Sequence, residues 1–309
     1  MQQAQEIVGQ VRRVVVGKDV VIGNILMAML AQGHVLLEDV PGVGKTTMAL
    51  AFSRAMDLSY KRMQFTPDVM PSDITGYTQL SPGGGTGAYV PGCAMCNLFL
   101  ADEINRASSK TQSALLEVME ENSITVDGVT HPVPQPFLVI ATQNPAGSSG
   151  TQPLPESQLD RFMVRLSMGY PDRRSEMEML RRHQNAVSLD AVARVVTPQD
   201  LANMQREVEN VYVSDALFAY LTELSAWTRA QSVIRIGVSP RGTIALLRMS
   251  KASAYLNGRD YLLPQDVQAV FEIVSAHRIQ LSPRAMVSGV TEHDLVNRAL
   301  SQVQAPVMV

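Results

Sequence analysis

The 309-residue sequence predicts an α/β fold, with helices covering a parallel sheet, followed by a smaller all-helical domain. Up to about residue 170, short apolar runs alternate with helical patterns, which is the rhythm of strand–helix–strand units. After Pro171 only helical periodicity remains. The length corresponds to about two average domains. We therefore expect a first domain over residues 1–170 and a second over residues 171–309.

Composition narrows the possible classes of protein. The chain is 46% hydrophobic and 18% charged, with a net charge of −3, so it can bury a core but lacks a strongly basic surface. The N-terminus shows no basic run leading into an apolar segment. The uncharged stretch Val20–Leu37 is interrupted by glycines and amides, so it predicts a helix, a turn and a buried strand and no membrane span. The cytoplasm is the expected location.

Five apolar runs in the first domain are candidate strands. Two helices are expected between them, at Lys45–Met56 and Ser109–Glu121, and Ser109 with Gln112 has capping-box spacing. The expected strands are His34–Glu38, Tyr60–Phe65, Asn97–Ala101, Phe137–Thr142 and Met163–Ser167.

Two insertions interrupt this pattern. Residues 66–92 are rich in proline and glycine, with a loop tip expected at Gly83–Gly85. Residues 123–136 contain two alternating segments separated by Asp127-Gly128, a dipeptide typical of tight hairpin turns. The second insertion therefore predicts a β-hairpin.

Helix-start signals recur after Pro171, the expected hinge. Thr197-Pro198 and Ser239-Pro240 join a capping residue to a first-turn proline, and Ser214 begins another helix. The face after Ser214 has apolar residues at helical spacing, as expected for a packed bundle.

The strongest motif is Asp39-Val-Pro-Gly-Val-Gly-Lys-Thr-Thr47, between a predicted strand and a predicted helix. Its glycines let backbone N–H groups surround phosphate oxygens, and the helix N-terminus adds positive potential. Lys45 is placed to reach the β- and γ-phosphates, and the Thr46 hydroxyl to ligate Mg²⁺. The usual pattern has glycine at the place of Asp39, and a glycine-rich loop before a surface helix is the alternative interpretation. The expected nucleotide-binding residues are Pro41, Gly42, Val43, Gly44, Lys45, Thr46 and Thr47.

Polar residues follow two further apolar runs. Asp102 and Glu103 end one run. Asp102 fits as the second Mg²⁺ partner. Glu103 fits as the group that orients or deprotonates the attacking water. Asn144 ends the next run, where its amide could hold that water. For Asp102 and Glu103, the alternative is a strand that ends in solvated acids. For Asn144, the alternative is a plain turn after a strand.

Two arginines are candidates for neutralising charge on the transferred phosphoryl group. Arg161 precedes the last predicted strand, and Arg241 opens a helix of the second domain. Arg165 and Arg173 compete with Arg161 for this role, and surface ion pairs are the alternative.

The only cysteines, Cys93 and Cys96, have a spacing that could serve a redox pair or half of a zinc site. Neither context is evident nearby, so ordinary reduced thiols are expected.

These features in this order resemble an AAA+ ATPase, and the amino-acid sequences of several blocks are more similar still to those of the MoxR branch. The resemblance runs from about residue 5 to the end of the chain. The blocks are Phe65–Gly76, Leu100–Ala107, Lys110–Glu117, Ala141–Pro145 and Leu154–Phe162.

The resemblance implies an αβα nucleotide-binding domain followed by a helical lid. Residues 66–92 would then be the insert in the helix after the second strand, and residues 123–136 the hairpin before sensor 1. Asn144 matches sensor 1, Arg161 the arginine finger and Arg241 sensor 2.

The family also implies partners. Its members resemble ring-forming, chaperone-like ATPases, so ATP and Mg²⁺ are the expected ligands and a hexamer the expected ring. They act with proteins that carry von Willebrand factor A domains, often to mature or activate an enzyme complex. The client is not identifiable from the sequence.

Two other functions are compatible with part of this pattern. A nucleic-acid-stimulated motor or loader is the main alternative, because other AAA+ branches carry both insertions, but no basic stripe interleaved with aromatic residues is present. A nucleotide-gated scaffold that hardly turns over is disfavoured by Glu103, Asn144 and Arg161.

Overall fold

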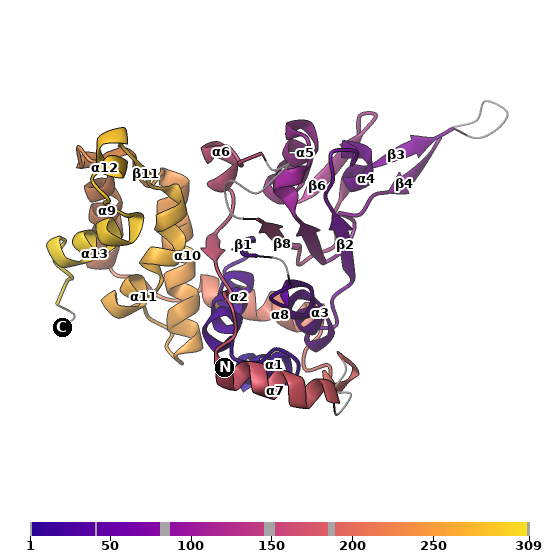
Figure 1. The fold of residues 1–309 in the computed structure, drawn as a ribbon, viewed down its shortest axis with the longest axis horizontal. Helices are drawn as coiled ribbons and strands as arrows, with labels where there is room; N and C mark the ends of the chain where they lie inside the picture. Colours follow the sequence, from indigo (N-terminus) through magenta and orange to yellow (C-terminus); the bar gives the residue numbers. More distant parts are fainter. Residues whose placement is uncertain (1, 41, 81–86, 145–151, 185–188, 308–309) are drawn as a thin grey trace.

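A five-stranded parallel sheet lies at the centre of the molecule (Figure 1). The computed structural model describes residues 2–40, 42–80, 87–144, 152–184 and 189–307. All five predicted strands are confirmed, and each strand end differs from the prediction by at most one residue. They are β1 (Val35–Glu38), β2 (Tyr60–Gln64), β5 (Leu98–Asp102), β8 (Leu138–Gln143) and β9 (Val164–Leu166), in the order β2-β5-β8-β1-β9.

Helices cover both faces of the sheet (Figure 1). Successive strand residues point to opposite faces, so Leu98 and Leu100 face one layer while Phe99 and Ala101 face the other. The first layer contains α1 (Gln2–Arg12), α2 (Asp19–Leu30), α3 (Lys45–Ala55), α7 (Arg173–Gln184) and α8 (Pro198–Glu209). The second layer contains α4 (Pro71–Thr75), α5 (Ser109–Glu121) and α6 (Glu156–Leu159). Two short 3₁₀ helices, η1 (Ile104–Arg106) and η2 (Leu189–Ala191), lie in the connections between these elements.

The capping residue of α5 corrects the sequence prediction. The helix spans Ser109–Glu121 as expected, but its N-cap is Ser108, whose hydroxyl accepts from the backbone N–H of Thr111 at 3.3 Å. Ser109 is already helical, so the pair with Gln112 forms no capping box. Two consecutive serines offer the same chemistry, and only the extended backbone at Ser108 decides between them.

Both insertions form antiparallel hairpins. Strands β3 (Gly76–Gln79) and β4 (Ala88–Pro91) project from the sheet side farthest from the C-terminus (Figure 1), and Gly83–Gly85 lie outside the described residues. Strands β6 (Ser123–Val126) and β7 (Val129–Pro132) form the predicted hairpin. Its turn residues Asp127 and Gly128 have φ values of 50° and 80°, as a tight hairpin turn of this type requires.

Residues 215–302 form a C-terminal bundle beside the sheet (Figure 1). Its helices are α9 (Asp215–Ala230), α10 (Pro240–Leu256), α11 (Pro264–Ser275), α12 (Pro283–Val287) and α13 (Glu292–Gln302), with a 3₁₀ turn η3 (Ala276–Arg278). The prediction of helices alone was wrong here, because β10 (Ile234–Ile236) and β11 (Gln280–Leu281) pair antiparallel. Strands of two and three residues carry too little alternation to be recognised from sequence.

The segment between β9 and the bundle packs back on the helices of the first layer. Arg182 of α7 donates to the carbonyl of Arg12 in α1 at 3.0 Å, and Gln205 of α8 donates to the carbonyl of Met29 in α2 at 2.8 Å. Helices α7 and α8 therefore contact the helices α1 and α2 directly, and a domain boundary at residue 171 stays a prediction.

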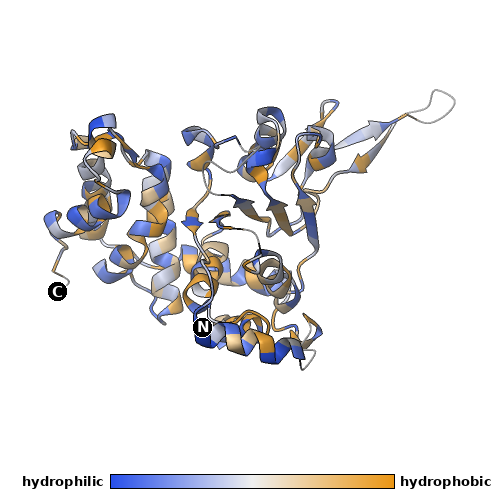
Figure 2. Ribbon diagram, in the orientation of Figure 1, coloured by the Kyte–Doolittle hydropathy of each residue, from blue (hydrophilic) through white to orange (hydrophobic). Residues whose placement is uncertain are grey.

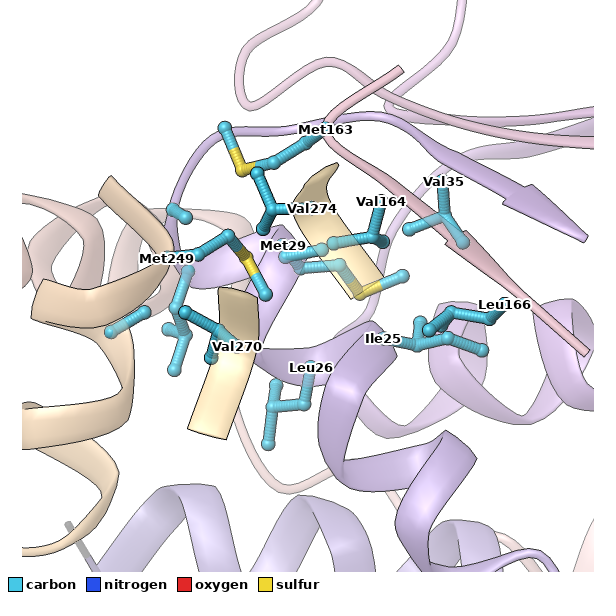
Figure 3. Close-up of a cluster of buried hydrophobic side chains, with 14 of the residues drawn as sticks. Ile25, Leu26, Met29, Val35, Met163, Val164, Leu166, Met249, Val270 and Val274 are labelled. Atoms are coloured by element: carbon cyan, nitrogen blue, oxygen red, sulfur yellow. The ribbon is translucent and has the colours of Figure 1, made fainter. Parts of the chain in front are cut away.

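The larger of two hydrophobic cores joins the sheet to the bundle. Met29 of α2, Val164 of β9, Met249 of α10 and Val270 of α11 meet in one buried cluster (Figure 3). Hydrophobic and hydrophilic segments alternate along the helices of the first layer and of the bundle (Figure 2). None of the described helices has the length and apolarity needed to cross a bilayer.

Candidate nucleotide-binding site

The loop after β1 forms one wall of a cleft at the carboxyl edge of the sheet. Gly42 and Gly44 have φ values of +86° and +94°, a conformation that glycine adopts at little cost. Gly44 directly precedes α3, so the loop leads into a helix N-terminus as the motif predicts. The cleft measures about 380 Å³ and is lined by Gly42, Gly44, Lys45, Thr46, Arg62, Gln64, Asp102 and Glu103.

Lys45 is the buried cation of this cleft. Only 8% of the residue is exposed, and its ammonium donates to the backbone carbonyl of Asp39 at 2.8 Å. Burial lowers the pKa of Lys45, while the charges of Asp39, Asp102 and Glu103 oppose that shift. An ammonium has three donors, so a lysine held this way retains donors for a phosphate oxygen.

Asp102 and Glu103 lie across the cleft at the end of β5, where the sequence placed them. The Thr142 hydroxyl of β8 donates to Asp102 at 2.6 Å and accepts from the Glu103 N–H at 2.8 Å. One buried side chain thus fixes both acidic residues. Arg62 of β2 pairs with the second Asp102 oxygen at 2.7 Å, and Arg106 pairs with Glu103 at 3.0 Å.

Asn144 follows β8, next to the strand that carries Asp102, as expected. Its backbone is held by Asn105, whose side chain donates to the Asn144 carbonyl at 3.2 Å. The side-chain oxygen of Asn144 is buried and has no hydrogen-bond partner among the described residues. A buried amide oxygen without a partner is costly, which is typical of a group kept free for a ligand or water.

The remaining motif residues differ in their surroundings. Val43 packs against the larger core, while Thr46 and Thr47 are half-buried in the first turn of α3. Pro41 lies outside the described residues. Thr46 and Asp102 share the cleft, and a hydroxyl with a carboxylate suits Mg²⁺, which takes few protein ligands and keeps several waters.

Asp39, at the position where glycine is usual, has a structural function that its carboxylate explains. The side chain accepts from the Ser167 hydroxyl at 2.9 Å, from the Gly169 N–H at 3.0 Å and from the Met168 N–H. Lys18 holds the same segment through the carbonyls of residues 168–170. Asp39 therefore ties the phosphate-binding loop to the chain leaving β9.

Arg161 and Arg241 do not line this cleft. They lie together at a second cavity, between the sheet and the bundle, where both pair with Glu120 of α5. Arg165, the competitor for the role of Arg161, pairs with Glu38 at 3.3 Å. The structure therefore brings together the loop, the two carboxylates and the strand that leads to Asn144, and it separates them from the two arginines.

Cys93 and Cys96 are free thiols, and burial raises the pKa of Cys96 to about 12. Within the described parts of the chain, no group of three His, Cys, Asp or Glu side chains gathers as a metal site.

Several residues of the site are not predicted from the sequence. Thr142 is the last residue of the predicted strand Phe137–Thr142, and that position was the available signal. Arg62, Asn105 and Glu120 act through contacts across the fold, which spacing along the chain does not report.

Comparison with known proteins agrees with this geometry. A family model described as the ATPase family associated with various cellular activities matches residues 34–164, and an AAA lid domain model matches residues 226–299. Chaperone MoxR1 of Mycobacterium tuberculosis is 38% identical over 96% of this chain and 81% of its own length. The chain belongs to the MoxR branch of the AAA+ ATPases.

Two further relatives cover nearly the whole MoxR-type chain. The uncharacterized protein YeaC of Bacillus subtilis is 45% identical over 97% of this chain and 94% of its own. The crystal structure of a candidate ATPase from Cytophaga hutchinsonii superposes with a TM-score of 0.90 at 37% identity, covering 99% of this chain and 96% of that one. The AAA+ core with a helical lid, expected from sequence, is confirmed.

Proposed function

We propose that this MoxR-type protein hydrolyses ATP in a homo-oligomeric ring and uses the cycle to remodel or activate a protein complex. The observation that carries the proposal is a division of the catalytic groups. The cleft holds Lys45, Asp102 and Glu103, whereas Arg161 and Arg241 lie together elsewhere. Each subunit would thus be incomplete alone, and a second copy would complete it.

Within one subunit, the roles follow from position. Backbone N–H groups of the loop and the Lys45 ammonium would bind the phosphates. Mg²⁺, held by the Thr46 hydroxyl and the Asp102 carboxylate, would neutralise phosphate charge. Glu103 would orient and deprotonate the attacking water, and Asn144 would hold it with its free amide oxygen.

Across the subunit boundary, Arg161 and Arg241 would approach the γ-phosphate bound by the neighbour. Their side chains are 31% and 45% exposed, so they can meet a second subunit. Because Arg241 shares a carboxylate with Arg161, we place both in trans. A hexamer is the ring size that the family suggests.

The client and its adaptor extend the proposal. A relative named as a chaperone supports a protein client, and a partner with a von Willebrand factor A domain is the adaptor expected of the family. The projecting β3–β4 hairpin and the β6–β7 hairpin would transmit subunit rotation to that client. The cytoplasm is the proposed location.

Two substitutions test the cleft. Lys45→Ala removes the phosphate-binding cation and should abolish ATP binding in a titration. Glu103→Gln should bind ATP normally yet turn over very slowly in a phosphate-release assay. Normal affinity in the first variant, or an unchanged kcat in the second, contradicts the assigned role.

Mixed rings test the division between subunits. Arg161→Ala and Lys45→Ala proteins should each be inactive alone. Mixed together, they should recover activity at interfaces that pair an intact cleft with an intact arginine. Confirmed mixed rings without recovery would exclude action in trans.

A further inference from the structure

Glu120, in the last turn of α5, pairs with both arginines through separate oxygens. Its Oε2 accepts from Arg161 at 2.5 Å, and its Oε1 accepts from Arg241. The three residues come from α5, from the turn before β9 and from the first turn of α10. One carboxylate therefore joins the sheet domain to the lid at the point where the arginines meet.

The backbones that carry the two arginines are already fixed by their neighbours. Asp160 accepts from the Ser239 hydroxyl at 2.8 Å and from the Arg278 guanidinium at 2.8 Å. Ser239 is the N-cap of α10, two residues before Arg241. With the main chain held by Asp160, what Glu120 determines is the direction of the arginine tips.

Both arginines keep free donors while they contact Glu120. Arg161 also donates to the Leu116 carbonyl at 3.0 Å, yet a guanidinium has five N–H groups in a planar fork. Two guanidinium groups side by side repel each other unless an anion separates them. A carboxylate between them stabilises the pair before a phosphate arrives, without occupying all of their donors.

We propose that Glu120 is a positioning residue that holds Arg161 and Arg241 as a pair directed at the nucleotide of the adjacent subunit. This inference rests on the proposed function in trans. Glu120 touches no nucleotide itself, and its carboxylate acts through the two arginines. Removing the outer partners that orient metal ligands costs about ten- to a hundredfold in activity, and we expect a loss of similar size when the partner that orients these arginines is removed.

Glu120→Gln keeps the size of the side chain and removes its charge. In rings of this variant, kcat should fall roughly tenfold, while ATP affinity should stay unchanged because the cleft lies elsewhere. Glu120→Ala should lose more, and Glu120→Asp should recover part of the activity. Glu121→Gln is the matched control, since Glu121 is the next residue, is exposed and has no ion pair among the described residues.

Mixed rings locate the effect. In rings of Lys45→Ala and Arg161→Ala subunits, the only productive interfaces use arginines from the Lys45→Ala subunit. Glu120→Gln placed on that subunit should lower the recovered activity about tenfold relative to the same substitution placed on the Arg161→Ala subunit.

The outcomes separate the two proposals. Mixed rings that never recover activity refute action in trans, and the inference with it. Rings that recover, but are equally active with either placement of Glu120→Gln, overturn the role of Glu120 alone. A rise in kcat overturns it too, because it would mean that Glu120 restrains the arginines.

Discussion

Thr142 shows how one residue can set the geometry of a catalytic edge. It is fully buried, and its hydroxyl bridges the Asp102 carboxylate and the Glu103 backbone N–H. Glu103 has a φ of 56°, a left-handed conformation that costs free energy outside glycine. The bond from Thr142 helps to hold that turn, and with it the direction in which Glu103 points.

Thr142→Val tests this bridge with an isosteric change. The Glu103 N–H loses its partner, so the free energy of unfolding should fall by about 1–3 kcal/mol. Misplacement of Glu103 should also lower kcat by about tenfold. Thr125→Val on the exposed β6–β7 hairpin is the control, since the Thr125 hydroxyl bonds to the Thr130 hydroxyl and touches neither acid of the site. Denaturant titration and phosphate release measure both effects, and equal values in the two variants would remove Thr142 from this role.

Under the proposed function, Arg62 would compete with Mg²⁺ for Asp102. Its guanidinium, 45% exposed, pairs with one Asp102 oxygen at 2.7 Å. Arg62→Gln removes that competition, so the Mg²⁺ concentration for half-maximal ATPase activity should fall roughly two- to fivefold. Arg54→Gln, which breaks an exposed pair with Asp190, should leave it unchanged. A higher Mg²⁺ requirement in Arg62→Gln would show instead that Arg62 assists nucleotide or metal binding.

The predictability of these residues depends on how they act. Lys45, Thr46 and the acids of β5 could be predicted because each stands next to a strand or helix end, where chain position alone fixes the location. Asp39 departs visibly from the usual pattern. Its bonds to residues 167–169, however, depend on the pairing of β1 with β9, which are far apart in the sequence. Arg62 and Glu120 act through similar distant contacts and could not be predicted.

At the scale of elements, His34 connects the start of β1 to its neighbours. Its ring nitrogens lie 3.0 Å from the Met119 carbonyl of α5 and 3.1 Å from the Val139 N–H of β8. The pKa of His34 is lowered to about 4, chiefly by burial; the bond to Met119 opposes the shift, and the charge of Arg248 adds to it. A neutral His34 therefore belongs to the folded state.

The lowered pKa predicts a loss of stability in acid. Between pH 6.5 and about 4, the unfolded chain takes up a proton at His34 that the folded chain does not. The stabilisation is complete above pH 6.5 and is lost as the pH falls toward 4, by about 3 kcal/mol in total. Urea titrations of wild-type and His34→Gln protein should show their difference in unfolding free energy shrinking over this interval. A constant difference would contradict the lowered pKa.

Elements were predictable in proportion to their length and pattern. Strands β1, β5, β8 and β9 are mostly buried runs, and β6–β7 alternates around Asp127-Gly128, so local sequence sufficed for these elements. Strand β2, at the edge of the sheet, has no buried residue. The pairing of β10 with β11 joins segments far apart in sequence, and neither is long enough to show a period. The cap of α5 at Ser108 was ambiguous because two serines adjoin.

For the whole molecule, the lid and the sheet domain share one core. The larger hydrophobic cluster runs from α1 and α2 through β9 to α10, α11 and α13. One polar link between the two parts is the ion pair of Asp160 with Arg278, and the Arg278 side chain is only 2% exposed. Apolar burial continues across the boundary between the sheet domain and the lid, and the Asp160–Arg278 ion pair connects the two parts. We therefore expect both parts to unfold together.

Calorimetry of the nucleotide-free protein at low concentration should therefore show a single transition. Asp160→Ala leaves the Arg278 guanidinium buried without its carboxylate and frees the N-cap of α10 from the turn before β9. Because breaking one partner of a buried pair costs about 3–5 kcal/mol, the transition should fall by roughly 10 °C or separate into two. Asp19→Ala, which breaks an exposed pair with Arg12, should move it by a degree or two at most. Two transitions in the wild-type protein would mean that the lid folds independently, and Asp160 would then have no role in joining the domains.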